Sequence, residues 1–480
     1  MTLDGPAHVG VALVALAALS VWGRRDMPTR LSAGGRRYRP DDARWARASD
    51  LASLTLRRGP QPGRLVLGRA GRRLVAAERG HSVLVVGPTQ SYKTTGFAVP
   101  ALLEWQGPVL AASVKTDLAS TTMSWRSRCG TVWVYDPTAS TTLPRAAWSP
   151  LLAATDWAGA RRVSHSLVEA ARPAAGSLAD ADFWYASAAK LLAPLLLAAA
   201  TSGRTMADVV RWIDEQEQME VAEALFCAGE PLALQAARAS WGRDDRQRSA
   251  VYTTAETVVD AFAELHDSLD VEAPAVDPSA LLGAANTLYL CAPAHEQRRV
   301  RPLFSALATA VLDGAFAAAN RAGRPLEPPL LVVLDEAANV APLAELDTLA
   351  STAAGHGVQL VTVWQDLAQM HARYGARAGS VLNNHRVKVF LSGIADLATL
   401  EHASGLVGAA EHRQRTTATD GRGARTTTEA PVVRPLLPPD RLRRLRPGSA
   451  VAVSGHLPPI RLRLRPWWRE PDLRRRVAPG

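Results

Sequence analysis

The sequence has 480 residues, with 55 Lys and Arg against 45 Asp and Glu, a formal net charge of +10 and a pI near 10.0. Hydrophobic residues make up 47% and charged residues 21%, a globular composition that excludes wholesale disorder. Three cysteines without a C-x-x-C pair exclude a disulfide scaffold and a cysteine-based zinc module.

The positive charge is divided between the two ends of the chain. Residues 24–79 carry 15 Arg and 5 acids, and residues 412–480 carry 16 Arg and 5 acids. The stretch 80–411 therefore has a net charge of −10. An anionic partner, nucleic acid or lipid, is expected to meet this protein locally and not over its whole surface.

The first residues have the pattern of a membrane anchor. Residues 5–23 are 19 residues without a formal charge, and Arg24 and Arg25 follow at once. This length and flank predict a single membrane span within residues 1–23, with the bulk of the protein cytoplasmic. A buried helix or a cleaved leader is the alternative. Residues 24–79 then form a basic juxtamembrane segment, with small strands expected near 64–67 and 73–76.

A phosphate-binding loop is predicted after the first buried strand. Residues 81–87 are apolar and β-branched, and a helical stretch extends to about residue 105. Between them lies the loop Gly87, Pro88, Thr89, Gln90, Ser91, Tyr92, Lys93, Thr94 and Thr95. In this context backbone N–H groups hold phosphates, Lys93 reaches the terminal phosphates and Thr94 ligates Mg²⁺.

Tyr92 departs from this loop pattern, because it occupies the position where a second glycine is usual. A side chain there is expected to clash with the phosphate or to strain the loop. On this motif alone, a plain strand-turn-helix corner is the alternative.

Two later strands end in polar residues that suit nucleotide chemistry. Residues 329–336 run apolar into Asp335 and Glu336, which predicts Asp335 near Mg²⁺ and Glu336 polarising the attacking water. A core strand with an acidic helix start would look the same. Residues 358–364 end at Gln365, a candidate to sense the γ-phosphate. The ordered set predicts a site for ATP and Mg²⁺, with Lys93, Glu336 and Gln365 as the catalytic candidates.

Residues 151–280 interrupt this strand pattern with Ala- and Leu-rich helical sequence, including helix-like spacing over 208–224 and 249–266. They predict an all-α insertion in an α/β domain formed by 80–150 and 281–411. The insertion's tryptophans (Trp184, Trp212 and Trp241) are expected in its core, and base stacking is the alternative.

The basic C-terminal segment, residues 412–480, has weaker signals. Residues 413–428 lack an apolar period and predict a mobile loop. Residues 451–454 and 460–465 predict two late strands, the second with the alternation of an edge or channel-facing strand. The final Arg-rich part, with Trp467 and Trp468, is expected to touch DNA phosphates or lipid, or to be a solvated basic tail.

Several further motifs carry a family resemblance. They are VLAASVKTDL at 109–118 with Lys115 and Asp117, TVWVYDP at 131–137, WSPL at 148–151, DFW at 182–184, VTVWQDLAQ at 361–369 and NNHRVKVFLS at 383–392. With the loop and the acidic strand, they resemble the type IV coupling proteins, the conjugative DNA-transfer ATPases, over roughly residues 80–410.

The resemblance implies an α/β, RecA-like P-loop NTPase domain with an inserted all-α subdomain and an N-terminal transmembrane helix. It implies a membrane-anchored ATPase, typically a hexameric ring, that brings single-stranded DNA with its relaxase, or protein substrates, to a type IV secretion channel. An arginine acting across the subunit interface is expected of such a ring. Arg373, Arg377 and Arg386 are the candidates.

Two other functions stay open from the sequence. Tyr92 motivates a non-hydrolysing receptor that docks substrates with a degenerate P-loop, and a cell-division-type DNA translocase shares the motor fold. The helical insertion argues against the translocase. A metal-dependent relaxase or protease is disfavoured because the sequence has no H-E-x-x-H motif.

Overall fold

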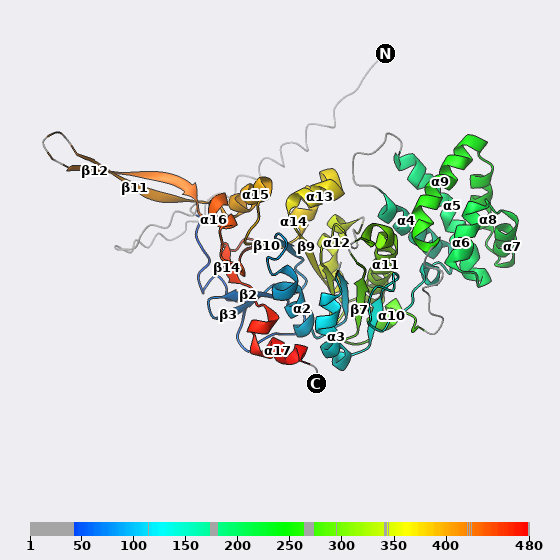
Figure 1. Cartoon of the computed structure of the whole chain (residues 1–480), viewed down its shortest axis with the longest axis horizontal. Coiled ribbons are helices and arrows are strands. Elements are labelled where there is room, and N and C mark those ends of the chain that lie inside the picture. The colour runs from blue at the N-terminus through cyan, green and yellow to red at the C-terminus, as the bar shows by residue number, and fades with distance from the viewer. Residues whose placement is uncertain are drawn as a thin grey trace, which may run out of the picture. The chain divides into compact units, whose positions relative to one another are not determined.

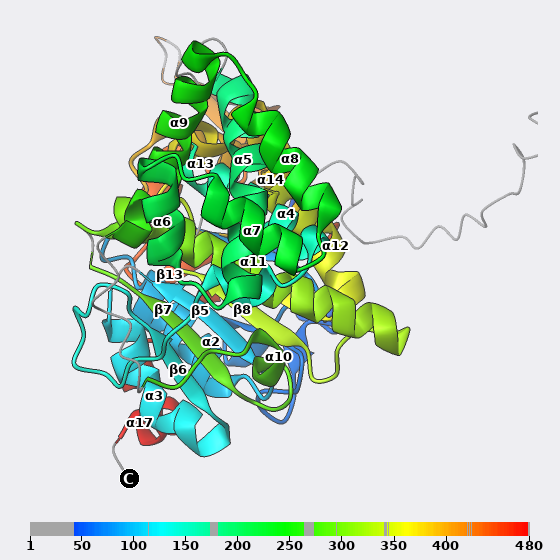
Figure 2. The same cartoon turned by 90° about the vertical axis from the view of Figure 1, so that its right-hand side faces the viewer.

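The computed structural model describes residues 43–478, apart from residues 114, 173–180, 264–272, 294, 340–342, 344, 420, 422 and 424. The predicted anchor and the first part of the predicted juxtamembrane segment lie outside the described residues. Within them, helices cover both faces of a central β-sheet, and a cluster of helices extends from one end (Figures 1 and 2).

The central sheet has twelve strands in the order β1-β3-β2-β14-β13-β10-β4-β9-β8-β5-β7-β6. Their bounds are β1 Thr55–Leu56, β2 Val66–Ala70, β3 Arg73–Ala76, β4 Val83–Val86, β5 Val109–Ser113, β6 Val132–Tyr135, β7 Thr287–Cys291, β8 Leu330–Leu334, β9 Val358–Trp364, β10 Val387–Leu391, β13 Ser449–Ser454 and β14 Ile460–Arg463. The seven strands from β10 to β6 pair in parallel, and the other five pair antiparallel.

The parallel strands coincide with the apolar runs of the sequence. Every residue of β4, β5, β7, β8 and β9 is buried, because parallel strands of this kind are covered on both faces. Along β4, Leu84 and Val86 belong to one hydrophobic core, and Val83 and Val85 belong to the core on the other face. The predicted α/β organisation is confirmed for these strands.

Residues 43–79 are joined to this sheet. The small strands expected in this segment are β2 and β3, and β2 pairs with β14 near the C-terminus through Arg69 and Arg463. The guanidinium of Arg69 also lies 2.7 Å from the carboxylate of Glu470. The two late strands predicted at 451–454 and 460–465 are present as β13 and β14, and β14 alternates buried with exposed side chains. The edge position expected for the second strand is wrong, since β14 lies between β13 and β2.

The predicted loop at 413–428 is also wrong. Strands β11 (Ala409–Thr419) and β12 (Arg425–Pro435) pair antiparallel along their whole length as a two-stranded hairpin that projects from the sheet (Figure 1). Most of its described side chains are exposed. Its residues show no apolar period because this ribbon covers no core, and main-chain pairing and β-branched threonines favour the extended form.

The described residues between 151 and 281 form the expected helical insertion, whose helices are grouped in Figure 2. Its helices are α4 Trp157–Ala171, α5 Ala181–Ser202, α6 Met206–Asp214, α7 Met219–Cys227, α8 Pro231–Trp241, α9 Asp245–Ala263 and α10 Pro278–Leu281. The helical spacing over 208–224 belongs to two helices, α6 and α7. Trp212 and Trp241 are buried and Trp184 is partly buried against the same core, so the prediction of core tryptophans is confirmed.

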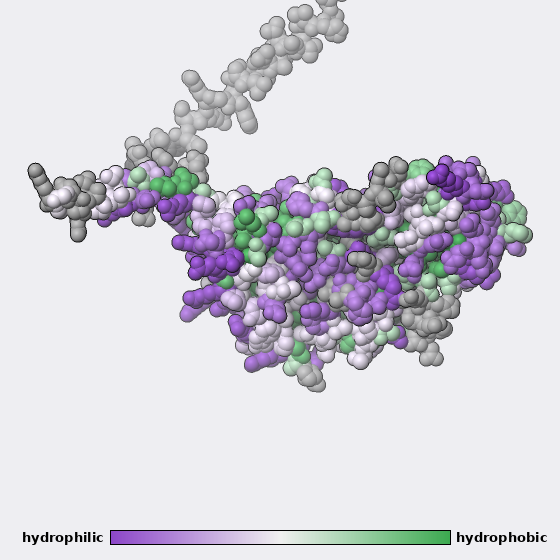
Figure 3. All heavy atoms as spheres, turned by 45° about the horizontal axis from the view of Figure 1, so that its top comes forward, coloured by the Kyte–Doolittle hydropathy of each residue, from purple (hydrophilic) through white to green (hydrophobic). Residues whose placement is uncertain are grey.

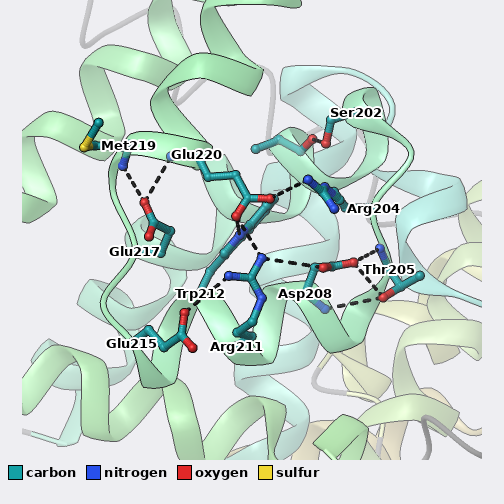
Figure 4. A network of polar contacts seen from close by, with 11 residues as sticks. Ser202, Arg204, Thr205, Asp208, Arg211, Trp212, Glu215, Glu217, Met219 and Glu220 are labelled. Carbon is teal, nitrogen blue, oxygen red and sulfur yellow. Dashed lines mark hydrogen bonds and ion pairs between the residues drawn. The ribbon is translucent and has the colours of Figure 1, made fainter.

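A polar network fixes the corner between α6 and α7 (Figure 4). Glu220 accepts hydrogen bonds from Arg211 at 2.8 Å and from the indole of Trp212 at 3.0 Å, and it pairs with Arg204 at 2.8 Å. Thr205 begins α6 with a capping box that Asp208 completes. The arginines of this corner are thus neutralised by the acids around them.

Among the described residues, two helices are long and apolar enough to cross a membrane: Ala181–Ser202, which is α5, and Arg299–Ala322 within α11 (Gln297–Ala322). Both are mostly buried, and both pack against α4. Hydrophilic side chains cover most of the visible surface at the helical end (Figure 3). The burial of α5 and α11 is that of helices in a protein core.

A fully buried arginine joins the segments that lead into β5 and β7. Arg126, on α3 (Asp117–Cys129), donates to the carbonyl oxygens of Trp105, Gly107 and Ala285 at 2.7–2.9 Å and to the hydroxyl of Thr287 at 2.7 Å. These partners are neutral carbonyl and hydroxyl oxygens, and none of the hydrogen bonds described for this guanidinium goes to an acid.

We expect Arg126→Met to lower the free energy of unfolding by on the order of 3 kcal/mol, because four buried acceptors lose their donor. Arg126→Lys should recover only part of this, since an ammonium group cannot reproduce the planar fork. Chemical denaturation followed by circular dichroism measures the effect. Arg128→Met, at an exposed position of the same helix, is the control, and equal losses in both variants would contradict the assignment.

Candidate nucleotide site

Three neighbouring parallel strands bring the predicted site residues together. Strand β9 lies between β4 and β8, so the residues that follow these strands meet at one edge of the sheet. The loop that starts at Gly87 follows β4, Gln365 follows β9 and Asp335 follows β8. The Gly87 N–H donates to the carbonyl of Trp364 at 3.0 Å, which fixes the loop against the end of β9.

The loop leads into a helix, as the sequence predicts. A π-helical turn, η1 (Thr94–Ala98), continues as α2 (Val99–Glu104). Lys93 is buried and donates through Nζ to the carbonyl of Gly87 at 2.5 Å, and the Ser91 hydroxyl donates to Pro88 at 2.7 Å. Burial lowers the pKa of Lys93. The ammonium group of Lys93 therefore bonds to the backbone of the loop to which it belongs.

The contact between Thr94 and Asp335 is the centre of the site. The Thr94 hydroxyl donates to Oδ2 of Asp335 at 2.7 Å, while Oδ1 of the same carboxylate is buried without a hydrogen-bond partner. Burial raises the pKa of Asp335 to about 6. A buried carboxylate with an unsatisfied oxygen beside a hydroxyl suits a hard cation, and Mg²⁺ commonly takes one or two protein ligands plus phosphate and water. The residues therefore fit Mg²⁺.

Glu336 and Gln365 are the other two residues predicted to take part in catalysis. Glu336 has a left-handed backbone (φ 61°), and its Oε2 accepts a hydrogen bond from Asn339 at 3.3 Å. Sequence reasoning did not identify Asn339. The Gln365 main-chain N–H donates to the Gln369 side chain at 3.2 Å, and Gln365 itself is half-buried. Both candidates thus lie at the sheet edge where the loop lies.

The backbone explains why a glycine suits position 92. Gln90 (φ 63°) and Tyr92 (φ 68°) are both left-handed, a conformation that costs a side-chain-bearing residue about 1–2 kcal/mol. The Tyr92 ring lies 6.0 Å from the ring of Trp468, and Gly448 lies beside it. The expected strain is present, and the side chain packs on the C-terminal segment.

That C-terminal segment is folded against the helix of the loop. Arg465 is 4% exposed and pairs with the buried carboxylate of Glu104, on α2, at 2.8 Å. Arg476 donates to the carbonyl of Leu103 at 2.5 Å and stacks over Trp125. The interpretation of the end of the chain as a solvated basic tail is wrong, because Arg465 and Arg476 have partners on α2, within the α/β domain. Glu104 is the one acid in the apolar helix α2, and this was the sequence feature that could have predicted a buried basic partner.

The three arginines considered for a role between subunits have different surroundings. Arg373 donates to the carbonyls of Arg172 and Glu169 in its own chain, and Arg377 lies 3.6 Å from Asp347. Arg386 is exposed and precedes β10, at the sheet edge opposite the loop. In the hydrogen bonds and ion pairs of the described residues, none of these three arginines contacts Thr94 or Asp335 of its own chain.

The contact of Tyr92 with Trp468 predicts coupling between the loop and the end of the chain. Trp468→Ala should weaken nucleotide binding a few-fold, because it removes an aromatic pair worth about 0.5–1.5 kcal/mol that holds Tyr92 in its strained conformation. In a Tyr92→Gly background the same substitution should have no effect. Isothermal titration with a non-hydrolysable nucleotide analogue completes the double-mutant cycle.

Trp45→Ala is the control, since Trp45 stacks with Arg461 and not with Tyr92. An effect of Trp468→Ala that is unchanged in the Tyr92→Gly background would mean that the two rings act independently.

Comparison with known proteins agrees with this geometry. A family model described as "Type IV secretory system Conjugative DNA transfer" matches residues 44–479. A conjugal transfer protein TraG from Escherichia coli is 24% identical over 89% of this chain and 74% of its own length. A TraG from Rhizobium radiobacter is 23% identical over 96% of this chain and 77% of its own.

Solved structures of the coupling protein TrwB share the fold. An unbound form has a TM-score of 0.66 at 17% identity and covers 88% of this chain and 92% of that one. TrwB with ADP and Mg²⁺ has a TM-score of 0.63 at 18% identity, over 90% and 96%. At this identity the likeness shows the TrwB-like α/β fold alone. Because the family model spans nearly the whole described chain, the chain belongs to the type IV secretory system conjugative DNA transfer family, the type IV coupling proteins.

Proposed function

We propose that this protein is a membrane-anchored ATPase that couples DNA or protein substrates to a type IV secretion or conjugation channel and drives DNA transfer. The observation that carries the proposal is the Thr94–Asp335 hydrogen bond, with the unpaired Oδ1 of Asp335, at the point where β4, β9 and β8 end. TraG and TrwB are the relatives on which the transport role rests.

Each residue of the site has a chemical role in this proposal. Thr94 and Asp335 would hold Mg²⁺, which when bound neutralises charge on the phosphates. Lys93 would exchange the Gly87 carbonyl for the terminal phosphates, and the backbone N–H groups of the loop would hold the others. Glu336 would polarise the attacking water, and Gln365 would sense the γ-phosphate.

The proposed setting follows the family. The uncharged run at 5–23 would anchor the protein in the inner membrane with its bulk in the cytoplasm. The partners would be single-stranded DNA with its relaxase and the components of the secretion channel, and the active form would be a homo-hexamer. TrwB structures contain an ATP analogue, or ADP and Mg²⁺, which supports these ligands for this chain.

A second function is favoured by one observation. Tyr92 keeps a left-handed conformation that glycine adopts more easily. A loop whose lysine is already bonded to its own backbone, and which carries a side chain at position 92, would bind nucleotide weakly, as a non-hydrolysing docking receptor would. The family assignment and the helical insertion argue against the cell-division-type translocase.

The first function predicts ATP hydrolysis stimulated by single-stranded DNA. Glu336→Gln should lower kcat by roughly 100-fold or more while nucleotide still binds, because the water loses its base. Lys93→Ala should weaken nucleotide binding itself. Steady-state turnover and titration with a nucleotide analogue separate the two effects.

The exposed Glu401→Gln is the matched control and should behave as the wild type. Unchanged DNA-stimulated turnover in Glu336→Gln would show that the site residues are wrongly assigned. Nucleotide binding without any turnover in the wild type would favour the docking receptor instead.

A further inference from the structure

The outer end of the central sheet carries a hollow lined by arginines. Strand β1 is the outermost strand and β3 lies beside it, whereas the helical insertion follows β6 at the other end of the sheet (Figure 1). A hollow of about 670 Å³ opens beside β1 and β3. No acidic residue lines it among the described residues, and its walls include Arg57, Arg69, Arg72 and Arg73 and the small residues Ala48 and Ala52. We call it the arginine hollow.

The strand register brings two of these arginines together. Strands β1 and β3 pair antiparallel, with Leu56 opposite Leu74. Continued by one residue, this register places Arg57 opposite Arg73, and both side chains are exposed. Like charges that face each other across a strand pair destabilise the pairing, and a bound anion would remove that cost. The arrangement therefore favours an anionic ligand at this edge.

The acids of the same segment do not neutralise the arginine hollow. Residues 43–79 contain nine Arg against two acids, a net charge of +7. Asp50 already pairs with Arg44 at 2.5 Å, and Glu78 lies 3.6 Å from the ring of His81. The positive charge of this segment is therefore left for a partner outside the segment.

The backbone under the arginine hollow is held in place. Strands β1, β2 and β3 bury a hydrophobic cluster of their own, formed by Leu56, Val66 and Ala76. The guanidinium of Arg69 is held by Glu470 at 2.7 Å. The turn between β2 and β3 is open, since no atom lies within 4 Å of a Cβ built on Gly71. A flat anionic surface can therefore approach arginines whose main chain is already fixed.

The place of this segment in the chain indicates the source of the anion. Residues 24–42 link the proposed anchor to Ala43, and at 3.3–3.6 Å per residue this link reaches at most about 70 Å. Residues 43–79 are therefore the part of the described structure that follows the anchor most closely along the chain. Anionic lipids of the cytoplasmic leaflet attract arginines in such juxtamembrane segments, each by about 1 kcal/mol.

The opposite end of the sheet has the opposite charge. Residues 151–280, most of which form the helical insertion, contain 10 Lys and Arg against 20 Asp and Glu, a net charge of −10. An anionic bilayer would attract the end that carries β1 and repel the end that carries the insertion. The two forces act in the same sense and would orient the α/β domain with the arginine hollow towards the membrane.

We propose that the arginine hollow binds the phosphate groups of anionic lipids at the bilayer surface, with Arg57, Arg72 and Arg73 as the contacting side chains. The inference rests on the proposed function, because it requires the membrane anchor. It adds an electrostatic attachment to the membrane, made by the same sheet that carries the candidate nucleotide site.

The test uses the full-length protein in nanodiscs of phosphatidylcholine, with or without about 30 mol% phosphatidylglycerol. Hydrogen–deuterium exchange of the main-chain amides of residues 57–73 should slow by about tenfold or more when phosphatidylglycerol is present, because lipid contact restricts the two turns. About 0.5 M salt should remove this protection, since screening weakens contacts between exposed charges and lipid. Exchange that is the same in both kinds of disc would overturn the proposal.

Arg57→Gln with Arg73→Gln should lose the response to phosphatidylglycerol, because two arginines at about 1 kcal/mol each correspond to a roughly 30-fold change in the docking equilibrium. Arg238→Gln with Arg246→Gln is the matched control, since both are exposed arginines of the insertion and the change in charge is the same. Equal losses in the two double variants would reduce the effect to overall charge. Protection that persists in Arg57→Gln with Arg73→Gln would exclude the arginine hollow.

Two further measurements separate the source of the phosphate and the premise. Duplex DNA added to phosphatidylcholine discs at the same phosphate concentration should leave the exchange of residues 57–73 unchanged. Protection by DNA equal to that by phosphatidylglycerol would assign the arginine hollow to nucleic acid and contradict the proposal. A wild type that does not enter phosphatidylcholine discs would disprove the anchor itself, whereas a wild type that enters them without protection by phosphatidylglycerol disproves only the lipid site.

Discussion

Strand β9 lies between β4 and β8, and its hydrogen bonds to both strands hold the phosphate-binding loop and Asp335 at a fixed separation. The Thr94 hydroxyl connects the loop to the carboxylate of Asp335 through a hydrogen bond of 2.7 Å. The register of three parallel strands therefore decides whether the residues of the candidate nucleotide site meet. A shift of one residue in β9 would exchange its two buried faces and move Gln365 away from the loop.

The strands beyond β4 support that register from one side. Strands β13 and β14 attach the end of the chain to β10, next to β4, and the residues that follow pack on the helix of the loop. The ion pair of Arg465 with Glu104 is almost fully buried, so removal of either partner would leave a charge without compensation. The strained Tyr92 rests against the same segment. The conformation of the loop therefore depends on how the C-terminal segment packs against it.

Much of this fold could be predicted from the sequence, for a clear physical reason. Strands buried on both faces are continuous apolar runs, so β4, β8 and β9 were recognisable along with Lys93, Thr94 and Asp335 at their ends. The hairpin β11–β12 was not, because a ribbon without a buried face has no hydrophobic period. The Arg465–Glu104 pair joins residues 361 positions apart, and no local pattern carries such a contact. Strand order, and with it the position of β14, depends on pairings of the same long range.

The attachment of residues 43–79 to the sheet has a mechanical consequence. The main chain of Ala43 is hydrogen-bonded to Ala409, and that of Ala46 to Pro459, before the chain enters β1, β2 and β3. A pull on the chain ahead of residue 43 would load these bonds first and would be passed on through β2, β14, β13 and β10 to β4. No slack linker separates that point from the strand that ends in the phosphate-binding loop. Tension at the N-terminal side would therefore reach the candidate nucleotide site as stress across a single sheet.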